Sequence, residues 1–200
     1  PDHRKGQSMN TQKENAIIAC QFRIDTATMQ KSILIDALDI VSQFEGKTVN
    51  ARIATALNER LAISYGQNEA ERYGGVKEKY NRVIASYRKS YPVGNVQYYD
   101  FDIYYHNIEN LPRLPDGYDF REMSDDKTIN LHFSDTVSDL LHMIRSRMEG
   151  LANEIRNYTE AIAHMDTIEA LAKNAKEARA DYDRATDKIY TVNRFFEMNR

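Results

Sequence analysis

The chain has 200 residues, with 27 Lys and Arg against 30 Asp and Glu, and a net charge of −3. This balance excludes the strongly basic composition of a typical nucleic-acid-binding domain. The single cysteine, Cys20, excludes an internal disulfide, and no apolar stretch approaches the ~20 residues that a membrane span needs. The composition therefore predicts a protein of a reducing cytoplasm with no membrane partner.

The front of the chain predicts short helices over residues 14–92, after a start at 1–13 that is disordered or added by the expression vector. Asp25 or Thr26 is the expected cap of a first helix that ends near Phe44. A second helix is expected at about 48–64. A third is expected from about 69 to 90, where Pro92 disfavours a helical residue before it.

The stretch Gly46-Lys47-Thr48 invites comparison with a phosphate-binding loop. That motif needs a glycine five positions before the Gly-Lys pair and a preceding buried strand, but Val41 stands there and the residues before it follow a helical period. Gly46 is therefore expected to end one helix, in the position where glycine is favoured, and Thr48 to cap the next.

The same segment carries a resemblance. Its residues resemble a segment of small uncharacterised proteins of phages and mobile elements, over less than a tenth of the chain: Phe44, Glu45, Gly46, Lys47, Asn50, Arg52, Ala56 and Leu57. The resemblance implies only an origin. Under that origin, an inhibitor of a host system or a minor structural component would fit equally.

The middle of the chain, residues 93–133, has a different character. Residues 96–107 are rich in tyrosine and 127–133 alternate β-branched residues, so both are expected to be strands of a small antiparallel ribbon. Between them lies a long loop with two of the four prolines and a Pro-Asp-Gly turn signal, with a third short strand expected at 118–122. Residues 98–132 carry 8 acidic and 3 basic residues.

This acidic and aromatic region is the expected partner-binding surface, because tyrosine offers a rigid apolar body with a polar tip. Its candidate residues are Tyr98, Tyr99, Asp100, Asp102, Tyr104, Tyr105, Tyr118 and Asp119. The Asp100-x-Asp102 spacing puts two carboxylates on one face of a strand, with His106, Glu109, Asp116 and Asp119 nearby in sequence, so a divalent-cation site in an enzyme is a third hypothesis. The alternative is a solvated strand face, which needs no metal and no cofactor.

The second hypothesis is nucleic-acid binding by the expected helix at 69–90. Tyr73, Tyr80 and Tyr87 recur every seven residues among cations, and such a pattern can stack bases and neutralise phosphates. The candidate residues are Arg72, Lys77, Lys79, Arg82 and Lys89. The ordinary alternative is a helix whose tyrosines face the core. The stretch TVNARIATALNER also has a weak similarity to a helix-turn-helix motif. Its only candidate base-reading side chains are Asn50, Arg52, Thr55 and Asn58.

The back third, residues 134–200, carries a heptad pattern of apolar residues that holds without a break from Val137 to Met165. The seam residues are Leu141, Ile144, Met148, Leu151, Ile155 and Ile162. The register slips between Met165 and Leu171 and then resumes. Two structures satisfy this pattern: an antiparallel coiled-coil hairpin that turns near 164–167, which we favour, and one helix of about 64 residues.

The sequence thus predicts a mainly helical protein with a small antiparallel β ribbon in the middle and a long C-terminal helical hairpin. Its expected function is non-enzymatic: a protein-interaction or assembly protein whose partner is another protein or a second copy of itself. Nucleic acid is the second partner class.

Overall fold

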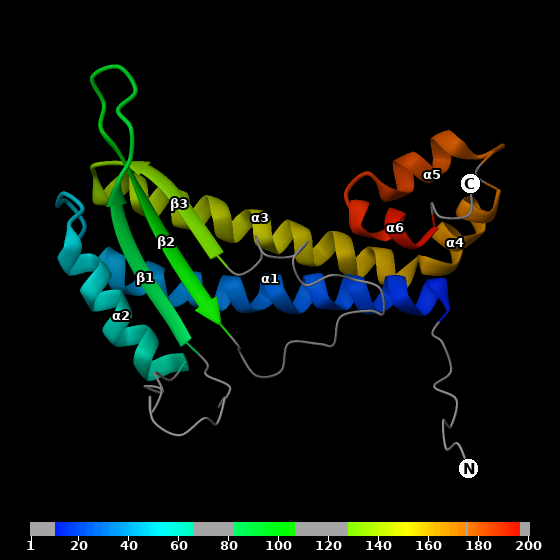
Figure 1. Ribbon diagram of the computed structural model, residues 1–200, viewed down its shortest axis with the longest axis horizontal. Helices are drawn as coiled ribbons and strands as arrows, with labels where there is room; N and C mark the ends of the chain where they lie inside the picture. Colours follow the sequence, from blue (N-terminus) through cyan, green and yellow to red (C-terminus); the bar gives the residue numbers. More distant parts are fainter. Residues whose placement is uncertain (1–10, 66–81, 107–127, 175, 197–200) are drawn as a thin grey trace, which may run out of the picture. The chain divides into compact units, whose positions relative to one another are not determined.

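The computed structural model describes residues 11–65, 82–106, 128–174 and 176–196. The described chain is mainly helical and includes a three-stranded antiparallel sheet (Figure 1). It divides into two compact units. Unit 1 comprises residues 1–25, 112–118 and 154–200, and unit 2 comprises residues 26–111 and 119–153.

The first helix, α1, spans Gln12–Ser42. It begins at a capping box: the Glu14 N–H donates to Thr11 Oγ1 at 3.2 Å, and the Thr11 N–H donates to Glu14 Oε2 at 2.6 Å. Hydrogen bonds from Thr11 to the Glu14 carboxylate, first of all from the Thr11 backbone N–H, hold the pKa of Glu14 below its ordinary value. The predicted start at Asp25 or Thr26 and the predicted short length are wrong, because Thr26 is a buried residue inside this 31-residue helix.

The turn at Gly46 is confirmed, since Gly46 has a φ of +80° and follows the end of α1. The second helix, α2, spans Ala51–Tyr65, close to the predicted range. Its cap is Asn50, whose Oδ1 accepts the Arg52 N–H at 2.9 Å. Thr48, the predicted cap, instead forms an isolated β-bridge with Thr136.

The sheet consists of β1 (Arg82–Lys89), β2 (Tyr98–His106) and β3 (Thr128–Ser134), in that order, with both pairings antiparallel. Strands β2 and β3 confirm the predicted ribbon. The predicted helix at 69–90 is wrong over β1, where all eight residues pair with β2. Residues 69–81, the loop at 107–126 and the expected strand at 118–122 lie outside the described residues.

Unit 2 buries one face of the sheet. Strand alternation places Ala85, Phe101, Ile103, Ile129, Leu131 and Phe133 on the same face, and each is at most 4% exposed. The helices of unit 2 contribute equally buried residues: Ile33, Leu34 and Val41 from α1, Ile53 and Leu57 from α2, and Leu140, Leu141 and Ile144 from the third helix, α3 (Val137–Ala163). Helix α2 lies beside β1 (Figure 1).

Unit 1 has a helical core. Its described elements after α3 are α4 (Met165–Lys173), α5 (Arg179–Thr186), the 3₁₀ helix η2 (Tyr190–Val192) and α6 (Asn193–Phe196). The core residues come from every one of these elements and from both long helices: Ala16, Cys20, Tyr158, Ala161, Met165, Ile168, Tyr182, Ile189, Val192 and Phe196.

The C-terminal hairpin of two long arms is not what the described residues form. Helix α3 lies where the first arm was expected, and His164 alone separates it from α4. The second arm is wrong as one helix, because α4 ends at Lys173 and is followed by three further short helices. The single 64-residue helix is wrong for the same reason.

The heptad positions Tyr158 of α3 and Met165 of α4 share the apolar core of unit 1 with Ala16 and Cys20 of α1. In unit 1, Lys13 pairs with Asp166, and Arg23 Nη2 lies 2.9 Å from Glu154 Oε1. In unit 2, Arg147 Nη2 donates to Gln30 Oε1 at 3.4 Å. Within unit 1, residue numbers rise along α1 as they fall from Asp166 to Glu154, so these two pairs are antiparallel. Of the seam residues, Leu141, Ile144 and Leu151 are buried, and Met148, Ile155 and Ile162 are half-buried.

Across the described ranges, none of the helices combines the length and the apolar character that crossing a membrane would require.

Candidate functional site

The outer face of the sheet, opposite the buried apolar face, carries a cluster of charged and polar side chains from all three strands. In the register of the sheet, Arg88 lies opposite Asp100, which lies opposite His132, and Asp102 lies opposite Asn130. Because side chains alternate between faces along a strand, these five residues share one face. We call them the Arg88 cluster.

Arg88 bridges the two carboxylates. Its Nη2 lies 3.2 Å from Asp100 Oδ2, and its Nε lies 3.3 Å from Asp102 Oδ2. The Asn130 side-chain amide donates to Asp102. The D-x-D spacing therefore does place both carboxylates on one face, and the cation between them is a guanidinium.

Asp100 also fixes the orientation of His132. Its Oδ1 lies 2.8 Å from His132 Nδ1. An ionised carboxylate only accepts hydrogen bonds, so Nδ1 carries the proton and Nε2 points away from Asp100. The imidazole is stacked on the Tyr98 ring, with centroids 4.9 Å apart and planes 4° from parallel.

The carboxylates of the Arg88 cluster are covered, while their partners reach the surface. The side chains of Asp100 and Asp102 are 12% and 4% exposed, against 65% for Arg88 and 47% for His132. A charge that is removed from water is tolerated when it is paired and hydrogen-bonded. The cluster is therefore a pre-arranged polar surface: two acidic groups held beneath an arginine and a histidine that contact solvent.

The two edges of the sheet differ. At the β1 edge, the Asn58 side chain on α2 takes the place of a neighbouring strand: its Nδ2 donates to the Ala85 carbonyl at 2.8 Å, and its Oδ1 accepts the Ala85 N–H at 2.7 Å. At the β3 edge, the Ser134 N–H donates to Asp139 Oδ2 at 2.6 Å. Among the described residues, no group pairs with the outward backbone of Asn130 or His132.

The predicted partner-binding residues divide between the two faces. Tyr98, Asp100 and Asp102 lie on the outer face. Tyr99 lies on the inner face, stacked with Tyr87 at a centroid distance of 5.2 Å and tilted against Phe133 at 6.3 Å. Tyr104 and Tyr105 belong to β2, but their side chains lie outside the described part, as do Tyr118 and Asp119 entirely.

The candidate nucleic-acid residues are only partly described. Arg82 and Lys89 are the two ends of β1, and Lys89 is exposed. Arg72, Lys77 and Lys79 lie outside the described residues. Arg88, a cation of the same segment, is committed to Asp100 and Asp102. Two residues of the helix-turn-helix hypothesis have structural roles instead. Asn50 caps α2, and Asn58 bonds to the backbone of Ala85 at the β1 edge.

The described ranges contain no group of three or more His, Cys, Asp or Glu side chains placed to hold a metal ion. Of the residues named for such a site, Glu109, Asp116 and Asp119 lie outside these ranges.

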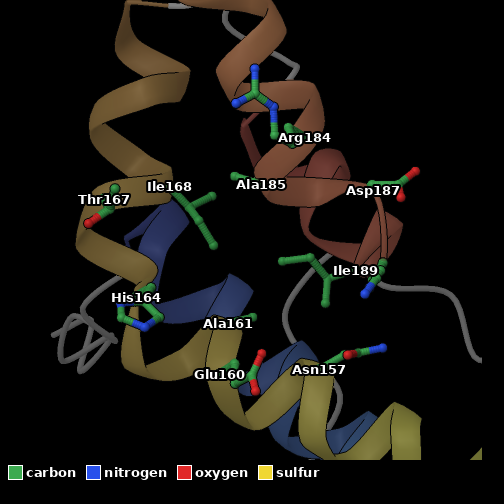
Figure 2. A pocket seen from close by; sticks show the side chains of 11 residues that line it. Asn157, Glu160, Ala161, His164, Thr167, Ile168, Arg184, Ala185, Asp187 and Ile189 are labelled. Carbon is green, nitrogen blue, oxygen red and sulfur yellow. The ribbon is translucent and has the colours of Figure 1, made fainter.

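A pocket lies within unit 1, between the α3–α4 junction and the segment from α5 to η2. It has a volume of about 380 Å³, which is near the lower end for small-molecule sites. Figure 2 shows Ile168 and Ile189 pointing toward each other across it. Its rim mixes both signs of charge and includes Glu160, His164, Arg184, Asp187 and Lys188.

The hairpin between β1 and β2 ends in an exposed apolar turn. Val93 and Val96 exchange backbone hydrogen bonds of 2.9 and 3.1 Å around Gly94, whose φ is +59°. Tyr91 is 88% exposed, and Val93 and Val96 are also exposed. The turn carries no charged residue.

The sequence did not predict Arg88, Asn130 and His132 as members of the Arg88 cluster, and it did not predict that Asn58 bonds to the β1 edge. One signal was present: the alternation in TINLHFS separates Asn130 and His132 from the apolar residues between them. Comparison of the chain with protein-family models, with curated proteins and with solved structures finds no match.

Proposed function

We propose that this protein is a non-enzymatic binding protein that recognises a protein partner through the outer face of its sheet. The observation that carries the proposal is the Arg88 cluster, in which the exposed Arg88 and His132 are held in fixed positions by covered carboxylates. Fixed polar side chains lose little conformational freedom on binding, so they favour specific recognition.

The chemistry of the cluster suits binding better than catalysis. Asp100 and Asp102 already accept hydrogen bonds from Arg88, His132 and Asn130. A carboxylate engaged in this way has less freedom to act as a general base or a metal ligand. Both roles suggested by the phage resemblance, an inhibitor of a host system and a minor structural component, are roles for a binding protein.

The heptad seam contributes less to this function than its pattern suggested. Its buried residues are covered by the same chain, so the seam stabilises the fold. A homo-oligomer would therefore need another surface. The outer face of the sheet and the exposed turn at Tyr91, Val93 and Val96 are the described surfaces with the right character.

Site-specific photo-crosslinking tests the proposal. A benzophenone amino acid is introduced in place of Tyr98, which lies in the proposed surface, or in place of Tyr190, an exposed tyrosine of unit 1 that serves as the matched control. Each variant is irradiated in a lysate of the source organism, and adducts are identified by mass spectrometry.

We expect a discrete adduct from position 98 and none from position 190. An adduct with twice the mass of the chain would identify the partner as a second copy. If position 98 gives no adduct, or if only position 190 does, the outer face of the sheet is not the binding surface.

A further inference from the structure

Resting on this proposed function, we infer that the bound segment of the partner is an extended peptide, which adds an antiparallel fourth strand along β3 and places a Lys or Arg side chain beside His132. The inference combines the direction of the backbone groups at the β3 edge, the contrast with the β1 edge, and the charge of the Arg88 cluster.

The hydrogen bonds of the sheet fix which groups of β3 point outward. The Ser90 N–H donates to the Tyr98 carbonyl, so the backbone groups of Tyr98 face β1. Ser134, opposite Tyr98 in the register, sends its N–H away from β2 to Asp139. Because the direction of backbone groups alternates along a strand, His132 and Asn130 point outward as Ser134 does.

These outward groups form a docking edge. A strand added there would exchange an N–H and a C=O with each of His132 and Asn130, four hydrogen bonds in all, as strand-addition partners do in other proteins. At the β1 edge, Asn58 already supplies that pair of bonds to Ala85. Helix α2 also lies beside β1, so within the described part of the chain we take β3 as the edge that accepts a partner strand.

The charge of the neighbouring face selects the occupant. The Arg88 guanidinium and the two carboxylates of the Arg88 cluster together carry a net charge of −1. The residue of an added strand opposite His132 would project its side chain onto this face, at a strand spacing of about 4.8 Å. A Lys or Arg there would lie beside His132 and offset the negative charge.

The same charge argues against a second copy of the chain as the occupant. Pairing β3 with β3 of another copy would bring two clusters of net charge −1 toward each other across the new interface. Like charges at such a distance disfavour association. A basic extended segment fits both the edge and the charge.

Model peptides test the inference directly. The probe is a nine-residue fluorescent peptide that alternates Val and Thr, with Lys at the centre, and its affinity is measured by anisotropy. We expect it to bind about tenfold more tightly than the same peptide with a central Glu, and the difference to shrink as salt rises. Methylation of the backbone nitrogen of the central Lys should cost about tenfold in affinity, because it removes the bond to His132 while keeping the side chain.

A pair of protein variants isolates the edge. Asn130→Ala and Asn130→Pro both lose the amide that contacts Asp102, but only the proline removes the outward N–H. We expect the Lys peptide to bind about tenfold more weakly to the proline variant than to the alanine variant. The methylated peptide gives the same information without altering the protein, should the proline variant not fold.

Three outcomes would overturn the inference: no binding of the Lys peptide at millimolar concentration, equal binding of the Lys and Glu peptides, or no effect of backbone methylation. A dimer in light scattering that Asn130→Pro converts to a monomer would also overturn it, since the occupant would then be a second copy. If position 98 still crosslinks to a partner protein, the proposed function survives these failures.

Discussion

The two units each contain a polar cluster built around one arginine, and the two arginines differ in exposure. In unit 1, Arg23 pairs with Glu154 at 2.9 Å and lies over the Tyr158 ring, and its side chain is 16% exposed. In unit 2, the side chain of Arg88 is 65% exposed above two covered carboxylates. The enclosed arginine can act only within the fold, whereas the exposed one can also contact a partner.

The surroundings of the two arginines explain this difference. The side chain of Arg23, on α1, pairs with Glu154 of α3 beside the apolar core of unit 1. Arg88 lies on a sheet of which only the opposite face is packed with apolar side chains. Changes near Arg23 should therefore alter stability, and changes near Arg88 should alter binding as well.

The largest effect is expected for Tyr158→Ala in unit 1. The ring is 2% exposed and its hydroxyl hydrogen-bonds Thr191 at 2.9 Å, so its loss leaves a cavity and an unpaired hydroxyl. We expect a loss of about 3–5 kcal/mol in the free energy of unfolding, measured by urea denaturation. The control is Tyr190→Ala, at a 66% exposed position, with an effect of about 0.5 kcal/mol or less. A small effect of Tyr158→Ala would contradict the enclosed character of this cluster.

Alkaline pH should weaken the same unit. Burial raises the pKa of Tyr158 to about 12 and that of Cys20 to about 12, whereas in the unfolded chain tyrosine and cysteine ionise at about 10 and 8.5. Below these unfolded values the stabilisation is complete. As pH rises further, the unfolded chain loses protons that the folded chain keeps, so stability falls until about pH 12, by up to about 1.4 kcal/mol per pH unit for each group.

Two variants assign this pH dependence. Tyr158→Phe and Cys20→Ala should each flatten the fall of unfolding free energy with pH, Cys20→Ala from about pH 9 and Tyr158→Phe from about pH 10. Tyr87 on the inner face of the sheet, whose pKa burial also raises to about 12, accounts for part of the remaining slope. Unchanged slopes in both variants would show that neither group is buried in the folded protein.

A smaller loss is expected for Arg88→Leu. It leaves two covered carboxylates without their guanidinium, which should cost about 1–3 kcal/mol in the free energy of unfolding. The matched control is Lys89→Leu at the next, exposed position of β1, for which we expect about 0.5 kcal/mol or less. The Arg88 variant should also lose the crosslink from position 98, and retention of that crosslink would separate the cluster from binding.

The smallest of the expected losses belongs to Asn58→Ala, which removes both hydrogen bonds to Ala85 and costs about 1–2 kcal/mol in unfolding free energy. Asn50→Ala is the control, because it removes a helix cap of similar worth on the same helix. Only the Asn58 variant should speed hydrogen exchange of the Ala85 amide. Equal exchange in the two variants would mean that Asn58 does not close the β1 edge.

The sequence predicted the elements whose signal is local. The heptads predicted α3, richness in tyrosine predicted β2, and β-branched alternation predicted β3. The signal for the start of α1 was equally local, because Thr11 and Glu14 form a capping box with the standard spacing. It was overlooked because Asp25 and Thr26 are also good capping residues and lie closer to the helical pattern of apolar residues. Strand β1 was misassigned since a seven-residue recurrence of tyrosine outweighed Val83-Ile84, a β-branched pair.

What the sequence could not predict depends on register between strands. Asp100 and Asp102 were found as a pair from their spacing, but their partner Arg88 lies 12 and 14 residues before them and meets them only through the pairing of β1 with β2. The closure of the β1 edge by Asn58 needs α2 to lie beside that strand. The short helices after His164 followed a helical period closely enough to suggest one arm, and the break at Asn174 has neither a glycine nor a proline to mark it.

The most direct measurement is amide hydrogen exchange of the free protein, resolved by residue along the sheet. The central claim predicts fast exchange at Asn130 and His132, whose N–H groups point outward from β3, and slow exchange at Ile129, Leu131 and Phe133, which pair with β2, and at Ala85, which Asn58 closes. Slow exchange at Asn130 and His132 would contradict it, because the β3 edge would then already be covered in the free protein.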